Sequence, residues 1–151
     1  MKRLAIALVS ALMAGPVMAD VQDIVRVKAS GDVASTMDAL EAAVKGAGAR
    51  VFARIDHAGG AEKAGMELAP SQVLIFGNPK LGTPAMQDDP LAGLFLPMKV
   101  LVYSDGDGQV WLAYEDPAEM LEDAEGVPAD AEYVGKMTRA LGKLAAKAAG
   151  G

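Results

Sequence analysis

Apolar and polar positions follow a regular pattern from the first predicted strand onward. Residues 25–29, Val-Arg-Val-Lys-Ala, alternate apolar and charged side chains, which predicts a half-buried strand. Asp32 can cap a helix that begins at Val33. From there an apolar side chain recurs every three or four positions, at Val33, Met37, Leu40, Val44 and Ala47. Gly46 and Gly48 favour the end of this helix, so the pattern predicts an opening strand–helix unit.

Residues 51–57 predict a second strand, whose last position is the one histidine of the chain. Because side chains alternate along a strand, His57 is expected to extend the apolar row of Val51, Ala53 and Ile55. Three interpretations stay open. The imidazole is satisfied by a backbone carbonyl at the edge of the core, or it binds a ligand or handles a proton, or it ligates a metal. A metal site is the least supported of these, since one histidine without cysteine seldom forms one.

Residues 72–76 are apolar on both faces, which predicts a strand in the interior of the sheet. Asn78-Pro79 and Thr83-Pro84 then follow, and each pair is typical of a helix start. Two starts so close together predict an ordered loop over the end of the strand. If this strand and residues 51–57 are neighbours, Asn78, Lys80 and Thr83 present hydrogen-bond donors near His57. These residues are therefore our candidate ligand-binding set, and the alternative is that they only cap the backbone.

The second half of the chain predicts a long irregular connection over 87–97, a hairpin and two helices. The hairpin joins strands over 98–103 and 109–114 through a loop with two Asp-Gly pairs. Asp105 and Asp107 do not make a calcium loop, because the sixth and twelfth places hold Val110 and Asp116 instead of Gly and Glu. A helix is predicted to begin after Asp116. The last helix starts near residue 130 and has an apolar stripe at Val134, Met137, Leu141, Leu144 and Ala148.

These elements predict an α+β fold. About five short strands form one mixed or antiparallel sheet, and two long helices cover one of its faces in a two-layer sandwich. The other face, with some of Phe52, Tyr103 and Trp111, needs a cover. A second subunit or the connection over 87–97 can supply it.

The first nineteen residues have the pattern of a signal peptide, with Lys2 and Arg3 before an apolar run and Val17-Met18-Ala19 before Asp20. We therefore expect a periplasmic or secreted protein, with residues 20–151 as a single domain and no membrane association after cleavage. The chain carries a net charge of −6, or −8 without Lys2 and Arg3, and has no basic cluster, which argues against nucleic acid. It has no cysteine, which excludes disulfides and thiolate chemistry.

Several segments resemble the "domain of unknown function 302" family. They are Ile55-Asp56-His57, residues 60–65, residues 75–79, Gly82-Thr83 and residues 96–102. The resemblance covers residues 25–148 and implies a compact α/β sandwich, often dimeric, without an established activity. The family's histidine and asparagine map onto His57 and Asn78. An acidic residue commonly precedes the family's Leu-Pro pair, where this chain has Phe95, so a polar role for that loop is not implied here.

Three functions are compatible with these observations. The first is a non-catalytic domain that binds a small molecule with His57, Asn78, Lys80 and Thr83, without a cofactor or metal. The second is a hydrolase- or lyase-type enzyme with His57 as general acid or base, although no nucleophile motif accompanies it. The third is an interaction module or homodimer scaffold that uses the Leu91–Leu96 segment. The methionines suggest copper, but their positions on helix stripes are better explained by core filling.

Overall fold

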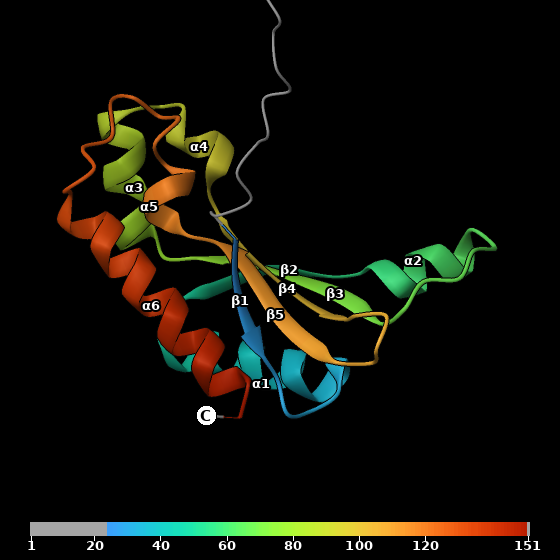
Figure 1. Ribbon diagram of the computed structural model, residues 1–151. Coiled ribbons are helices and arrows are strands. Elements are labelled where there is room, and N and C mark those ends of the chain that lie inside the picture. Colours follow the sequence, from blue (N-terminus) through green and yellow to red (C-terminus); the bar gives the residue numbers. More distant parts are fainter. Residues whose placement is uncertain (1–23, 151) are drawn as a thin grey trace, which may run out of the picture.

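The computed structural model describes residues 24–150 (Figure 1), so the predicted signal peptide over 1–19 lies outside the described residues. The elements in chain order are β1 (Ile24–Lys28), α1 (Val33–Gly46), β2 (Arg50–Asp56), α2 (His57–Lys63), β3 (Ser71–Gly77), α3 (Pro79–Asp88), α4 (Ala92–Phe95), β4 (Met98–Ser104), β5 (Val110–Glu115), α5 (Pro117–Met120) and α6 (Glu132–Ala148).

The five strands form one sheet in the order β1-β5-β4-β3-β2, and all four neighbouring pairs are antiparallel. The α+β class is thereby confirmed, and the sheet is antiparallel rather than mixed. The interior position predicted for residues 72–76 is also correct, since β3 pairs with β2 on one side and β4 on the other.

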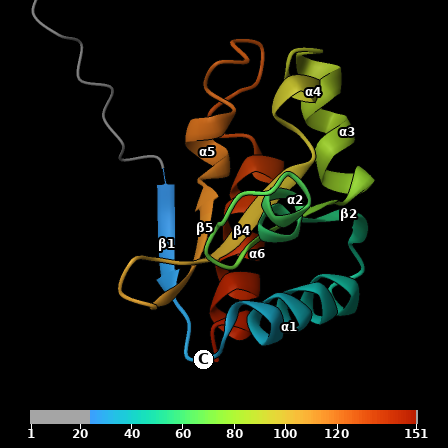
Figure 2. The same ribbon diagram turned by 90° about the vertical axis from the view of Figure 1, so that its right-hand side faces the viewer.

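Both long helices lie on the same side of the sheet (Figures 1 and 2). α1 packs on strands β2, β3 and β4, and α6 packs against α1, α3 and α5. Between the layers lie side chains of both helices and the inward row of each central strand. They include Met37, Leu40, Val44, Leu74, Phe76, Val100, Val102, Leu112, Met137 and Leu141, each at most 1 % exposed. Burying one such side chain contributes roughly 1.5–3 kcal/mol, so this layer is the main source of stability.

Helix α1 begins as the sequence predicts. The side chain of Asp32 accepts a hydrogen bond from the backbone N–H of Ser35 at 2.7 Å, which satisfies one of the free donors of the first turn. These hydrogen bonds also hold the pKa of the Asp32 carboxyl below its usual range.

The register of β2 shifts between Val51 and Ala53, which leaves Phe52 as an extra residue in that strand. Beyond the shift, Arg54 faces α1, where its guanidinium pairs with Asp38 at 2.5 Å and with Glu41 at 3.4 Å. Ala53 pairs with Ile75 on the other face of the sheet. The expected single row from Val51 to His57 is therefore wrong, because the bulge reverses the alternation.

Two further local predictions need correction. Thr83-Pro84 does not start a helix: α3 runs unbroken from Pro79 to Asp88 with Pro84 inside it, and the cap is Asn78. A proline there costs the helix one backbone hydrogen bond. The connection over 87–97 includes the end of α3 and all of α4. α4 lies beside α3 (Figure 2), and Ala92 is fully buried, so the connection does not cover the second face of the sheet.

Candidate functional site

A cavity of about 310 Å³ lies where the ends of β3 and β4 meet α3 and α6. Every element of that corner contributes to its wall. The lining residues are Phe52, Gly77, Asn78, Pro79, Leu81, Gly82, Thr83, Met86, Leu96, Pro97, Met98 and Met137. A volume of this size is at the lower end of the range for small-molecule sites.

The floor of the cavity is apolar and firmly held. Met98 and Met137 lie in the core at 6 % and 0 % exposure, whereas Met86 at the rim is 40 % exposed. Methionine has three rotatable bonds and a polarisable sulfur, so a wall with three methionines adapts to apolar molecules of different shape.

Two glycines keep the cavity open. A Cβ on Gly77 would lie 3.3 Å from the ring of Phe52, and a Cβ on Gly82 would lie 3.6 Å from Cδ1 of Leu96. Side chains at these positions would therefore occupy space that the cavity now has. The bulged Phe52 completes this side of the wall, and the guanidinium of Arg50 stacks on its ring at 5.3 Å from the centroid.

Two of the four candidate binding residues line the cavity. Asn78 ends β3, and its Oδ1 accepts a hydrogen bond from the N–H of Lys80 at 3.0 Å, as an N-cap does. Thr83 lies one turn further along α3. Lys80 lies in the first turn of the same helix but is exposed and does not line the cavity. Only the carboxamide and the hydroxyl thus bring polar side-chain groups to an otherwise apolar wall.

His57 lies at the other end of the sheet from Asn78. β2 and β3 are antiparallel: Asp56 pairs with Gln72, near the start of β3, whereas Arg50 pairs with Gly77 at its end. His57 follows Asp56 as the first residue of α2, is exposed, and belongs to a helix without a buried residue. The expectation that His57 and Asn78 share one recess is therefore wrong, because consecutive antiparallel strands end at opposite edges of a sheet.

The segment around His57 has its own local hydrogen bonding. Asp56 caps α2 by accepting the N–H of Gly59 at 3.0 Å. Within residues 24–150 no group of three or more His, Asp or Glu side chains is placed to hold a metal ion.

The helices that flank the cavity are joined by one side-chain hydrogen bond. The hydroxyl of Tyr133, in the first turn of α6, donates to Asp88 at the end of α3 at 2.6 Å. Burial and the neighbouring Asp88 carboxylate raise the pKa of Tyr133 to about 12. This pair fixes α3 against α6 near Met86 and Met137.

The chemistry of the cavity is that of binding. None of its lining residues carries an ionisable side chain, so the wall itself offers no general acid, general base or charged ligand group. Sequence reasoning found Asn78 and Thr83 from their capping patterns but missed Phe52, Met86, Leu96 and Met137. The crowded apolar segment before Pro97 was the available signal, and it pointed to a surface or an interface rather than to a cavity wall.

Comparisons with known proteins agree on the family. The profile of the family described as "Domain of unknown function DUF302" matches residues 25–144. A solved structure, the uncharacterised conserved protein DUF302 from Bacillus stearothermophilus, superposes with a TM-score of 0.75 at 21 % identity, covering 84 % of this chain and 98 % of that one. At this identity the likeness concerns the fold alone.

Part of the chain is also similar to longer curated proteins. A stretch of 105 residues, 68 % of this chain, is 45 % identical to proteins named Fluoride-specific ion channel FluC 1 from Brucella suis biovar 1 and from Brucella abortus biovar 1. The chain spans about two fifths of the length of these relatives (41 % and 39 %). In residues 24–150 no helix has the length and apolar character needed to cross a bilayer.

Proposed function

The chain belongs to the DUF302 family of domains of unknown function, and we propose that it binds a small, largely apolar molecule, without catalysis, in the cavity between α3, β4 and α6. The observation that supports this proposal most directly is the wall of that cavity. It combines a buried apolar floor with two polar side chains, Asn78 and Thr83, that can orient a ligand. Small-molecule sites commonly have this composition.

The alternatives receive less support from the structure. An enzyme that uses His57 as general acid or base stays a prediction, but such an enzyme would have to act elsewhere than in this cavity, since the imidazole lies at the opposite edge of the sheet. The names of the fluoride channels describe proteins of which this chain matches about two fifths, so we transfer no transport activity from them.

A neutral, environment-sensitive fluorophore, N-phenyl-1-naphthylamine, tests the proposal. We expect a saturable fluorescence increase with one site per chain. Gly82→Leu should reduce the affinity about tenfold or more, because the new side chain fills the space beside Leu96. The matched control is Gly60→Leu on α2, where a Cβ meets no atom within 4 Å.

The proposal fails if the fluorophore shows no saturable binding, or if Gly82→Leu binds it as well as the unchanged protein does while Gly60→Leu behaves like both. Native mass spectrometry of protein purified from its source then identifies the natural ligand by mass, and the Gly82→Leu variant should lack that adduct.

We also propose that the domain acts in the periplasm or outside the cell. The support is the sequence pattern over 1–19, with its two basic residues, apolar run and small-residue cleavage site. Intact-mass measurement of the protein from the native host tests this. An N-terminus at Asp20 is expected, and a chain that retains residues 1–19 in the cytoplasmic fraction would contradict the proposal.

A further inference from the structure

The face of the sheet opposite the long helices is covered by no helix of residues 24–150 (Figure 1). A row of paired side chains crosses its middle from one edge to the other. The row consists of Ile55, Val73, Leu101, Ala113 and Arg26, on β2, β3, β4, β5 and β1 in turn. Its three central members are only half-buried, and Ile55 is 42 % exposed. We name this side of the sheet the open face. Contiguous apolar surface of this kind marks an interaction site in soluble proteins.

An aromatic cluster stiffens the open face beside this row. The guanidinium of Arg26 lies over the rings of Trp111 and Tyr103, at 4.7 and 5.6 Å from their centroids, and donates a hydrogen bond to the Tyr103 hydroxyl. The indole N–H of Trp111 donates to Asp105 at 2.7 Å. Large side chains held in one conformation lose little entropy when a partner covers them.

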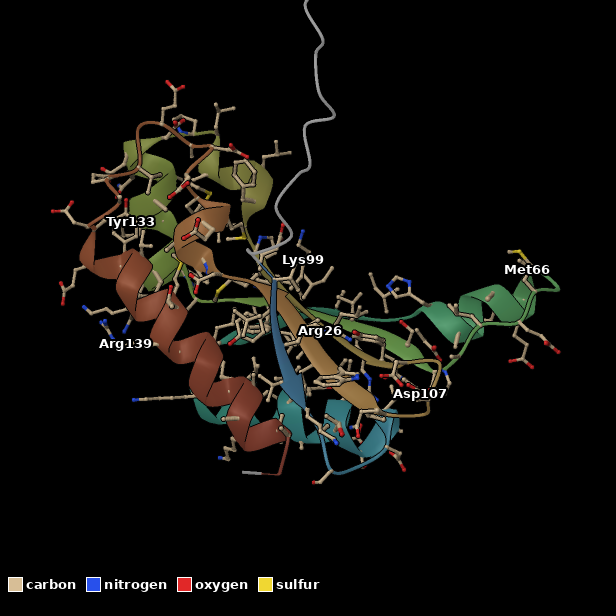
Figure 3. All side chains as sticks on the ribbon, in the orientation of Figure 1. Arg26, Met66, Lys99, Asp107, Tyr133 and Arg139 are labelled. Atoms are coloured by element: carbon tan, nitrogen blue, oxygen red, sulfur yellow. The ribbon has the colours of Figure 1, made fainter. Side chains whose placement is uncertain are left out.

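The segment 57–70, which we name the arm, extends from the same end of the sheet. It consists of α2 and the chain that returns to β3, and Figure 3 shows Met66 at its far tip. α2 has seven residues, and none of them is buried. Met66 and Leu68 are 62 % and 53 % exposed. An isolated helix this short is marginal in water, so the arm has less support from its own domain than any other element.

The open face and the arm have opposite charge. Three basic side chains stand on the open face, Arg26, Lys28 and Lys99, against one acidic side chain, Glu115, which lies 3.9 Å from Lys99. Such a surplus of basic groups is unusual in a chain with a net charge of −6. The arm carries Glu62 and Glu67 against one basic residue, Lys63. One molecule thus offers both an acidic, apolar projection and a basic, apolar surface.

The size of the surface favours participation of both parts. Five strands about 4.8 Å apart and roughly 20 Å long give a face of about 400–500 Å², whereas a stable interface buries about 800 Å² on each partner. The open face alone falls short of this area, and an arm laid across it makes up the difference.

We propose that the open face is the interface with a second copy of this chain, and that the arm of each copy lies on the open face of the other. Met66 and Leu68 then cover apolar side chains of the partner's central row, and the acidic arm meets the basic side chains of the partner's face. Because the same surfaces serve both copies, the contact is two-fold symmetric and closes at the dimer. This inference is independent of ligand binding, since the cavity lies at the other end of the sheet.

Light scattering coupled to size exclusion tests the interface, with residues 20–151 at high micromolar concentration. We expect a dimer. Leu101→Glu, in the middle of the open face, should weaken it about tenfold or more, because it places a charge among apolar side chains. The control is Leu94→Glu on α4, which replaces a leucine that is 79 % exposed and lies outside the open face, and which should leave the dimer unchanged.

A charge exchange tests the arm separately. Glu62→Lys with Glu67→Lys should weaken the dimer, and the further changes Lys28→Glu and Lys99→Glu in the same chain should restore it, because the two surfaces become complementary again with reversed sign. Binding of N-phenyl-1-naphthylamine to each variant shows that the domain remains folded. A monomeric unchanged protein, a dimer indifferent to Leu101→Glu, or a charge exchange without recovery would overturn the proposal.

Discussion

The hydroxyl of Tyr133 donates a hydrogen bond to the carboxylate of Asp88 across the junction of α6 and α3, at 2.6 Å. The two residues lie 45 positions apart in the chain. They close the corner of the molecule in which Met86 and Met137 line the cavity. The geometry of the proposed binding site therefore depends on a contact that is not itself part of its wall.

Tyr133→Phe should lower the free energy of unfolding by about 0.5–1.5 kcal/mol, the usual contribution of one hydrogen bond. The pKa of Tyr133 in the folded protein, about 12, exceeds that of an unfolded tyrosine, about 10. Its stabilising effect is therefore complete below pH 10 and is lost as the pH rises to 12. Urea titrations between pH 8 and 12 should show a steeper loss for the unchanged protein than for Tyr133→Phe. Parallel curves would contradict this assignment.

Asn78 and Lys80 differ in what they contribute to α3, although both stand at its start. Asn78→Ala removes the N-cap and should cost about 1 kcal/mol in thermal unfolding, whereas Lys80→Ala should change stability by less than about 0.5 kcal/mol. Asn78→Asp keeps the capping oxygen but places a carboxylate on the cavity wall. It should retain stability and weaken binding of the neutral fluorophore. Equal binding by Asn78→Asp would show that the carboxamide is only a cap.

Two glycine substitutions should have opposite signs. Gly82 lies inside α3, and a Cβ there makes an ordinary 3.6 Å contact with Leu96, so Gly82→Ala should stabilise the protein by about 0.5–1 kcal/mol. Gly48 follows α1 with φ of +74°. Gly48→Ala should destabilise the protein by about 1 kcal/mol, because an L residue is strained in that conformation. Chemical denaturation of both variants checks the prediction, and equal signs would contradict it.

Trp111→Phe should raise the pKa of Asp105. The indole N–H is the largest cause of the lowered pKa of this carboxyl, ahead of the backbone hydrogen bonds from Gln109 and Asp107. A group whose pKa is depressed by folding stabilises the folded state at neutral pH and loses that effect as the pH falls through its folded pKa. Carbon-detected NMR titration of the aspartates should therefore show a higher midpoint for Asp105 in the variant. Asp107, for comparison, should titrate as before.

The local calls that depend on one helix or one turn were predictable from sequence. Asp32 as cap, the stripe through Met37 and Leu40, and the turn at Asp105 are correct because neighbouring residues alone decide them. The same holds for the stripe of α6, where Met137 and Leu141 are buried as expected.

The errors concern relations between strands. The bulge at Phe52 has no mark in the sequence, because it depends on which residue of β3 stands opposite. The distance between His57 and Asn78 followed from the direction of pairing, which the sequence left open between mixed and antiparallel. The interior position of Pro84 was missed because Thr83-Pro84 has the same local pattern as a true helix start, and only the packing of α3 distinguishes the two.

The arm has a consequence for how the molecule moves. Few buried contacts tie residues 57–70 to the core, so this segment should open at a small fraction of the free energy needed to unfold the sheet. Its amide hydrogens should exchange with solvent first, well before those of β4. A partner that holds the arm would slow this exchange, so hydrogen–deuterium exchange at α2 becomes a sensor of assembly that needs no label and no substitution.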